Sequence, residues 1–215
     1  MAATAVPKSP GSPWKVVVAT LVVCVALVAG CTALLTRFLG AFMAYAPAVM
    51  PVDGARMLER EKERLGLKDT EYNRWVHLAN VAFWSVDGGD LAKAVEYADE
   101  AMAMAPAYRS DWNYGNVIHK VNLTRGRVAL RLGQPKAAAA FLLAAGATRG
   151  SPQLDSFGPN MLLARELLEA GESDAVLRYI DLCGRFWERD LGAMWAWKRI
   201  INGGRIPNFG AHLLH

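Results

Sequence analysis

The chain has 215 residues, of which 53% are hydrophobic and 20% are charged, and its net charge is +4. This length and composition fit one folded domain with a sizeable core plus an appendage. The mild positive charge is spread along the sequence, which argues against a protein that binds nucleic acid. The three cysteines form no CxxC pair, which argues against a disulfide framework and against cysteine-based zinc or haem sites.

Residues 1–15 are rich in proline and serine, and we expect them to form a disordered lead. Residues 16–36 follow as an uncharged apolar run, with Trp14 and Lys15 before it and Arg37 after it. A helix needs ~20 residues to cross the hydrocarbon core of a bilayer, and a single segment in lipid must be helical to satisfy its own backbone. We therefore expect a single transmembrane helix over residues 16–36, in the inner membrane of a bacterial envelope.

Basic residues around this run predict its orientation. Lys8, Lys15 and the terminal amine precede it, whereas Arg37 alone follows it closely. The tendency of positive charge to remain inside then places the N-terminus in the cytoplasm. We expect most of the chain to be extracytoplasmic, on the periplasmic side.

Residues 28–31, Val-Ala-Gly-Cys, also resemble a bacterial lipobox, with apolar and basic residues upstream. In this alternative the signal ends before Cys31, which becomes the lipidated first residue of a mature lipoprotein. The residues after Cys31 stay apolar, whereas lipoproteins more often continue with a polar tether, and this favours an uncleaved anchor. Both alternatives attach the chain to a membrane.

Residues 37–52 are apolar but contain Pro47 and Pro51, which prevent one long regular helix. We expect a juxtamembrane extension and then a hinge. Residues 53–202 show helical periodicity and little strand signal, which predicts an all-α domain. Asp53 is expected to cap a first helix that ends at Gly66, with alternating charges on its outer face.

Three glycines mark three predicted helical hairpins. Gly89, Gly133 and Gly171 each follow a small residue by seven positions, and Ala, Val or Cys stands five and twelve positions after each. Small residues at these offsets let two helices cross closely on either side of a tight turn. Asp90 and Ser173 are the expected N-caps of the second helix in the first and third hairpins. The predicted helix pairs are 71–86 with 91–105, 117–132 with 136–147, and 160–170 with 173–187.

This pattern resembles the tetratricopeptide repeat (TPR) family, whose helix-turn-helix unit has small residues at the helix crossing and a proline at its end. The matching residues are Ala82, Gly89, Asp90, Ala94, Ala98, Ala101 and Pro106, then Gly126, Gly133, Ala138 and Ala145, then Ala164, Gly171 and Tyr179. The units are longer than those of the family, and an irregular helical bundle is the alternative. The resemblance implies TPR-like stacked hairpins that bind other proteins.

Trp187, Leu191 and Trp195 share one helical face, which predicts an amphipathic helix that caps the stack. The tail, residues 203–215, is expected to pack back over the domain or to serve as a docking strip. The sequence contains no HExxH, GxSxG, GxxxxGK[ST] or GxGxxG motif. We therefore expect a protein that is not an enzyme, without a cofactor, a metal or a small-molecule substrate.

The resemblance also implies a concave groove lined by the first helix of each hairpin. The residues expected in this partner groove are Phe83, Lys120, Leu123, Arg127, Arg131, Met161 and Arg165. Arginine forks there would clamp an acidic peptide or a C-terminal carboxylate. The alternative is that these basic residues form an ordinary solvated helix face.

We therefore expect a membrane-anchored scaffold or adaptor that binds a protein partner outside the cytoplasm. The alternative is a structural accessory subunit of a membrane complex, held mainly through its transmembrane helix. In that alternative Ala26, Gly30 and Ala33 provide a face of small residues for helix packing in lipid.

Overall fold

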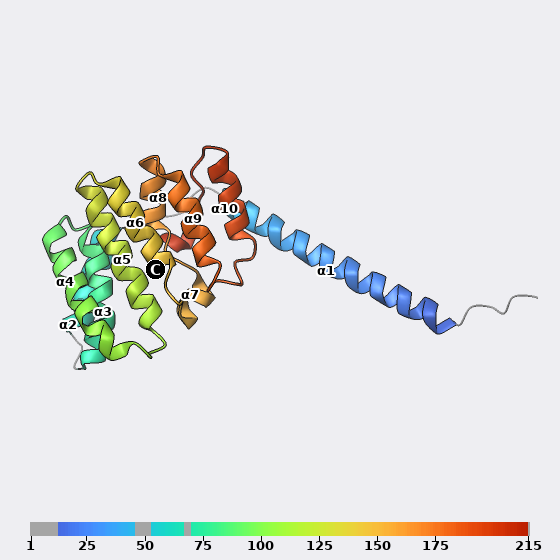
Figure 1. The fold of residues 1–215 in the computed structure, drawn as a ribbon, viewed down its shortest axis with the longest axis horizontal. Coiled ribbons are helices and arrows are strands. Elements are labelled where there is room, and N and C mark those ends of the chain that lie inside the picture. The colour runs from blue at the N-terminus through green and yellow to red at the C-terminus, as the bar shows by residue number, and fades with distance from the viewer. Residues whose placement is uncertain (1–12, 46–52, 67–69, 215) are drawn as a thin grey trace, which may run out of the picture.

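The computed structural model describes residues 13–45, 53–66 and 70–214, and within these residues every regular element is a helix. The elements are α1 (Pro13–Tyr45), α2 (Gly54–Gly66), α3 (Glu71–Ser85), α4 (Leu91–Met104), η1 (Ala105–Tyr108), α5 (Tyr114–Arg131), α6 (Pro135–Gly146), α7 (Pro152–Phe157), α8 (Leu162–Glu169), α9 (Ser173–Cys183), α10 (Ala193–Asn202) and η2 (Gly210–Leu213). The predicted all-α class is confirmed. Helix α1 extends away from a domain that the other helices form (Figure 1).

Helix α1 differs from the sequence prediction at both ends. It begins at Pro13, so residues 13–15 of the expected lead are helical, and it runs on to Tyr45 without a break at Arg37. Proline is tolerated at the first helical position because no intrahelical partner awaits its missing N–H. The rest of the lead and residues 46–52 of the predicted juxtamembrane segment and hinge (37–52) lie outside the described residues.

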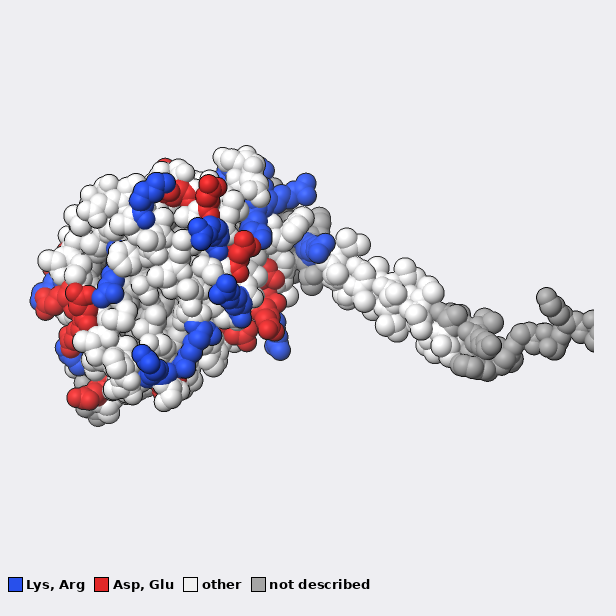
Figure 2. All heavy atoms as spheres, in the orientation of Figure 1, with Lys and Arg blue, Asp and Glu red and all other residues white. Residues whose placement is uncertain are grey.

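Within the part of the chain that the structure describes, no helix combines the length and the apolar character needed to cross a membrane. Charged side chains are scattered over the visible face of the domain, whereas the described part of α1 that projects from it is almost free of them (Figure 2).

Helix α2 has the predicted ends. The Asp53 carboxylate accepts a hydrogen bond from the backbone N–H of Arg56 at 3.0 Å, and the helix ends at Gly66. Helix α3 begins after Thr70, whose hydroxyl accepts from the N–H of Asn73 at 3.3 Å. Such caps satisfy backbone donors that have no partner within the helix.

The three predicted turns share one backbone geometry. Gly89, Gly133 and Gly171 have φ angles of 78°, 73° and 84°, a region that glycine adopts without strain. In each turn the glycine N–H donates to the carbonyl three residues earlier, and the next N–H donates to the carbonyl five residues earlier. These two bonds satisfy the last carbonyls of the first helix and reverse the chain.

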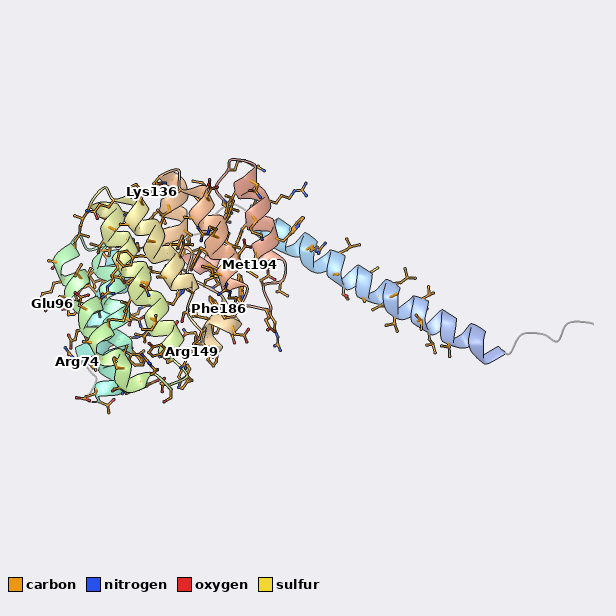
Figure 3. All side chains as sticks on the ribbon, in the orientation of Figure 1. Arg74, Glu96, Lys136, Arg149, Phe186 and Met194 are labelled. Carbon is orange, nitrogen blue, oxygen red and sulfur yellow. The ribbon has the colours of Figure 1, made fainter. Side chains whose placement is uncertain are left out.

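Each turn joins a pair of packed helices: α3 with α4, α5 with α6, and α8 with α9. Neighbouring hairpins meet through α4 against α5 and α6 against α9. The small residues predicted at the crossings are all buried: Ala82, Ala94, Ala101, Gly126, Ala138, Ala145, Ala164, Val176 and Cys183. The stack has two ends, with Arg74 and Glu96 at the end far from α1 and Met194 beside α1 (Figure 3).

The C-terminal part of the stack departs from the prediction. The N-cap position of α9 is Glu172 rather than Ser173, the Glu172 side chain makes no capping hydrogen bond, and the helix ends at Cys183. Helix α10 starts only at Ala193, because Leu191 and Gly192 have positive φ angles of 51° and 85° and end any helical path before it.

The predicted stripe of Trp187, Leu191 and Trp195 is therefore wrong. The buried face of α10 contains Ala196, Trp197, Ile200 and Ile201, whereas Trp195 is 42% exposed. In the tail, Phe209 and Leu213 are buried, so this segment packs back on the domain.

Candidate functional site

The residues predicted to line a groove do not form an open surface. Phe83, Leu123, Arg127 and Met161 are fully buried in the domain. Helix α2 packs along α3, and its Leu58 belongs to the same apolar cluster as Phe83. Buried side chains contact the chain itself, so these four residues are core residues in this conformation.

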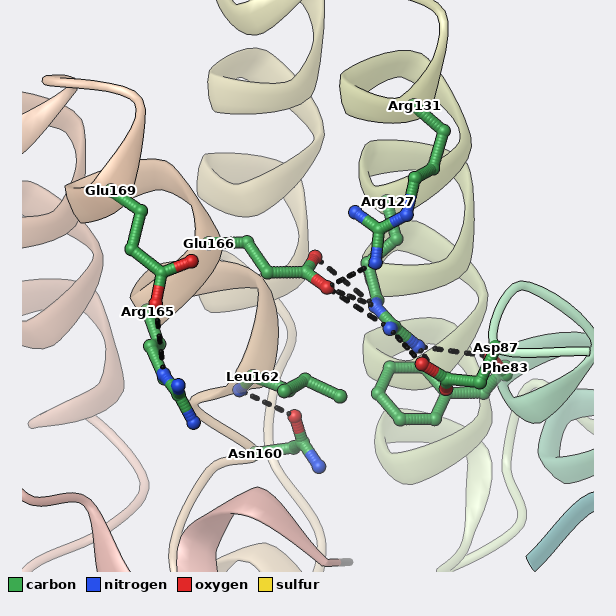
Figure 4. A network of polar contacts seen from close by, with 9 residues as sticks. All are labelled: Phe83, Asp87, Arg127, Arg131, Asn160, Leu162, Arg165, Glu166 and Glu169. Carbon is green, nitrogen blue, oxygen red and sulfur yellow. Dashed lines mark hydrogen bonds and ion pairs between the residues drawn. The ribbon is translucent and has the colours of Figure 1, made fainter. Parts of the chain in front are cut away.

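Arg127 is the centre of a buried ion network (Figure 4). Its guanidinium donates to both oxygens of Asp87, at 2.9 and 2.7 Å, and to Glu166 at 3.0 Å. It also donates to the backbone carbonyl of Phe83 at 3.2 Å, and its central carbon lies 4.9 Å from the centre of that ring. Arg127 therefore binds carboxylates of the chain itself, and it is not placed to clamp an acidic peptide as predicted.

Asp87 and Glu166 stabilise the positive charge of the buried Arg127 side chain. Burial lowers the pKa of this guanidinium, but the hydrogen bonds and charges of Asp87 and Glu166 outweigh burial and raise its pKa above the ordinary value. Arg131 adds a second cation to Glu166 at 2.7 Å, and its side chain is 40% exposed. The network thus contains two positive charges, on Arg127 and Arg131, and two negative charges, on Asp87 and Glu166, so its net charge is zero.

Arg165 does not join this network. Its Nε atom donates to Glu169 on the same helix at 3.0 Å, and both side chains are about half exposed. Such a pair on a helix surface is a weak contact. Arg165 is therefore an ordinary solvated residue, as the alternative reading of the basic positions proposed.

Lys120 belongs to a second polar cluster, between α2, α3 and α5. Its Nζ donates to the Asn80 side chain at 2.9 Å, and Asn80 donates to Glu61 at 3.2 Å. Glu61 also lies 3.1 Å from His77 Nδ1. Burial lowers the pKa of Lys120 to about 8, although the charge of Glu61 opposes the shift.

Glu61 was missed by the sequence analysis, which placed the charges of this helix on a solvated face. It is 4% exposed and supplies the carboxylate that holds α2 on α3. A signal was present, because Glu61 is three residues after Leu58 and four before Leu65, on the apolar face of an amphipathic helix.

A third cluster lies between the second and third hairpins. Tyr179 donates to the backbone carbonyl of Asn160 at 2.8 Å, and His119 Nδ1 lies 3.0 Å from the carbonyl of Ala145. Burial raises the pKa of the nearby Cys183 thiol, which is unreactive for that reason. Among the described residues, no group of three or more His, Cys, Asp and Glu side chains is arranged to hold a metal ion.

The three clusters connect helices inside the domain. The candidate functional site therefore lies on the exposed surface. Nine large apolar side chains of α1 are exposed, from 45% for Val18 to 69% for Leu34. Cys31, the predicted lipidation residue, is also exposed on this helix. Helix α1 contacts the domain through α10.

The outer face of α10 adds a second exposed feature. Trp195, Lys198, Arg199, Asn202 and Gly203 line an open depression of about 460 Å³. The Arg199 guanidinium lies 5.6 Å from the centre of the Trp195 ring, and Lys198 pairs with Asp181 at 2.6 Å. The candidate functional site is therefore the apolar helix α1 together with the basic and aromatic face of α10 beside it.

No protein-family model matches the chain, and neither the curated proteins nor the solved structures contain a match.

Proposed function

We propose that this chain is a membrane-anchored helical scaffold, in which α1 is the anchor and the hairpin domain holds a protein partner outside the cytoplasm. The observation that carries the proposal is the exposure of apolar side chains along α1. Each Å² of apolar surface left in water costs about 25 cal/mol relative to burial. A large exposed apolar surface on a projecting helix marks a site that a bilayer or another protein covers.

The sequence supports the bilayer as the cover. Residues 16–36 carry no charge, and Lys15 and Arg37 flank them. This length is near the ~20 residues that a helix uses to cross the hydrocarbon core. The flanking charges favour an N-terminus in the cytoplasm and a periplasmic domain, by the positive-inside tendency.

The scaffold role is supported by the hairpins. Their three turns share one hydrogen-bond pattern, and the polar clusters inside the domain join helices to each other. Stacks of TPR-like hairpins generally present surfaces for other proteins rather than catalytic centres. The partner would contact exposed residues, because the core of the expected groove is filled by the chain itself.

A second candidate function is an accessory subunit held in a membrane complex through α1 alone. Ala26, Gly30 and Ala33 fall on one face of this helix, and no atom lies within 4 Å of a Cβ placed on Gly30. Small residues on one face let another helix approach closely in lipid.

Alkaline carbonate extraction of bacterial membranes tests the anchor. The full chain is expected to stay in the pellet, and the Leu27→Lys, Val28→Lys double variant is expected to be released. Leu132→Lys is the matched control, because Leu132 is 59% exposed on the domain. Release of the unchanged chain, or retention of the double variant, would overturn the anchor.

Exchange of residues 16–36 for an unrelated apolar helix separates the two functions. A scaffold keeps its partner after this exchange, because the domain makes the contact. An accessory subunit loses its complex, because the unrelated helix lacks the face of small residues (Ala26, Gly30 and Ala33) that packs against the other subunit. Co-purification of the complex from membranes, with the unchanged chain alongside, is the measurement.

A further inference from the structure

The outer face of α10 has a composition that differs from an ordinary solvated helix face. Trp195, Arg199 and Asn202 are exposed at spacings of four and three residues, which places them in one row. Leu191 and Ile206, on either side of the helix, are 59% and 45% exposed. The helix thus presents an exposed aromatic and a basic side chain in one row, and the segments before and after it each expose a large aliphatic side chain.

The position of this face relative to α1 is the second observation. Among the described helices of the domain, α10 makes an extensive contact with α1. Figure 1 shows it at the end of the domain from which α1 leaves, where it runs across the direction of α1. A helix that lies across an anchor runs along the surface of the bilayer that the anchor enters.

We propose that the outer face of α10 is a contact site for the headgroups of anionic phospholipids, which holds the domain against the membrane surface. This inference rests on the proposed anchoring through α1. The depression lined by Trp195, Lys198 and Arg199 is the place of contact, and its ligand is a phosphate group with its glycerol linkage.

The side chains suit this ligand. Arg199 forms no ion pair with a carboxylate in the described part of the chain, so its guanidinium is available to donate two hydrogen bonds to a phosphate. Trp195 has an apolar ring and one N–H donor, which is the combination enriched at the interface of membrane and water. Lys198 is already neutralised by Asp181, so it contributes little to the net attraction.

The extent of the site favours a lipid headgroup over an acidic protein here. Five residues line the open depression, whereas stable protein interfaces bury about 800 Å² on each partner. A headgroup needs only a few donors at the depth of the interface, and attachment through α1 makes its local concentration high. An acidic protein on this face is the competing outcome of the test.

The experiment uses the full chain reconstituted into phosphatidylcholine vesicles, with and without phosphatidylglycerol. Part of the lipid carries bromine near the headgroup end of its acyl chains, which quenches tryptophan fluorescence at short range. We expect quenching to increase when phosphatidylglycerol is present. Trp195→Phe and Arg199→Glu should each remove at least half of this increase, and added salt should weaken it.

Arg74→Glu is the matched control, because Arg74 is a surface arginine at the end of the domain far from α1 (Figure 3). It should leave the increase unchanged. Circular dichroism melts of all variants report whether the domain remains folded. An increase that persists in Arg199→Glu, or that Arg74→Glu removes equally, overturns the contact site.

Carbonate washing of the same vesicles separates this inference from the proposed function. Loss of the unchanged chain on washing shows that α1 is no anchor. Retention of the chain without any dependence on phosphatidylglycerol shows that the anchor stands and the headgroup site does not. A protein crosslinked at position 195 in membranes lacking that dependence would assign the face to an acidic partner and overturn the lipid site.

Discussion

The guanidinium of Arg127 lies 3.0 Å from the carboxylate of Glu166, and this pair joins α5 of the second hairpin to α8 of the third. The same guanidinium lies 2.7 Å from Asp87, which belongs to the turn of the first hairpin. One buried cation therefore holds three hairpins in a fixed arrangement. Its two carboxylates are 24% and 12% exposed, so both are mostly buried with the cation.

Replacement of this cation is the first test of the arrangement. Arg127→Met keeps most of the volume of the side chain but leaves Asp87 and Glu166 without their shared partner. Removal of one member of a buried ion pair costs about 3–5 kcal/mol, and we expect the lower part of this range because water reaches both carboxylates. Denaturant unfolding of the detergent-solubilised chain measures the loss.

Arg131→Met is the control for that variant. Arg131 contacts the same Glu166 oxygen at 2.7 Å, but its side chain is 40% exposed. Exposed pairs contribute roughly 0–1 kcal/mol, so the free energy of unfolding should change little. Equal losses in the two variants would contradict a special role for the buried cation.

Lys120 makes the free energy of unfolding depend on pH in the alkaline range. Its pKa is lowered from 10.5 to about 8 in the folded state, mainly by burial. Between these two values the unfolded chain binds more protons than the folded chain, so the free energy of unfolding rises with pH across this range. One pKa unit corresponds to about 1.4 kcal/mol, and because Lys120 is only partly buried we expect a rise of roughly 1–2 kcal/mol.

Denaturant unfolding at several pH values, from 7 upward, measures this rise as a difference between variants. Lys120→Met lacks the titrating group, so its stability relative to the unchanged chain should fall as the pH increases. Lys136→Met is the control, because the Lys136 side chain is 87% exposed, and it should follow the unchanged chain. Parallel curves for all three proteins would show that burial does not perturb Lys120.

The hairpins could be predicted because their signals are local. Glycine at a position with positive φ, an aspartate that caps the next helix and small residues at fixed offsets all act within one unit. Gly89 and Asp90 illustrate this, since Gly89 lies in the predicted turn and Asp90 caps the next helix as predicted. Packing then buries the small residues, as at Ala94 and Ala101.

The candidate site was harder to predict because it depends on packing between distant segments. Arg127 has the same local sequence signals whether it faces solvent or meets Asp87, which is 40 positions away. The sequence predicts Trp195 on the buried face of a helix that starts before Leu191, but Leu191 has a positive φ and the helix starts at Ala193. A shift in the start of a helix changes which residues share its apolar face.

Gly126 tests the close crossing of the second hairpin. A Cβ placed there would overlap the Leu163 side chain and lie 3.2 Å from both the Ala138 carbonyl oxygen and Phe141 Cβ. Alanine favours a helix over glycine by about 1 kcal/mol, but overpacking a filled core costs about 1–3 kcal/mol. We expect Gly126→Ala to lower the melting temperature.

Gly66→Ala is the companion variant, since a Cβ at the end of α2 would meet no described atom within 4 Å beyond its own helix backbone and chain neighbours. It should leave the melting temperature unchanged or raise it. If Gly126→Ala were equally harmless, the helices would not need a glycine where they cross.

Cys31 decides between an anchor that stays on the chain and a signal that is removed. It is exposed on α1, fourteen residues before the end of a helix that continues without interruption to Tyr45. Because the residues that follow Cys31 are helical and apolar rather than a polar tether, we expect the uncleaved chain. Cys31→Ser should then leave the chain in the membrane fraction with its N-terminal residues still attached. Mass spectrometry of membrane-extracted protein is the measurement, and a mature chain that begins at a lipidated Cys31 would establish the lipoprotein instead.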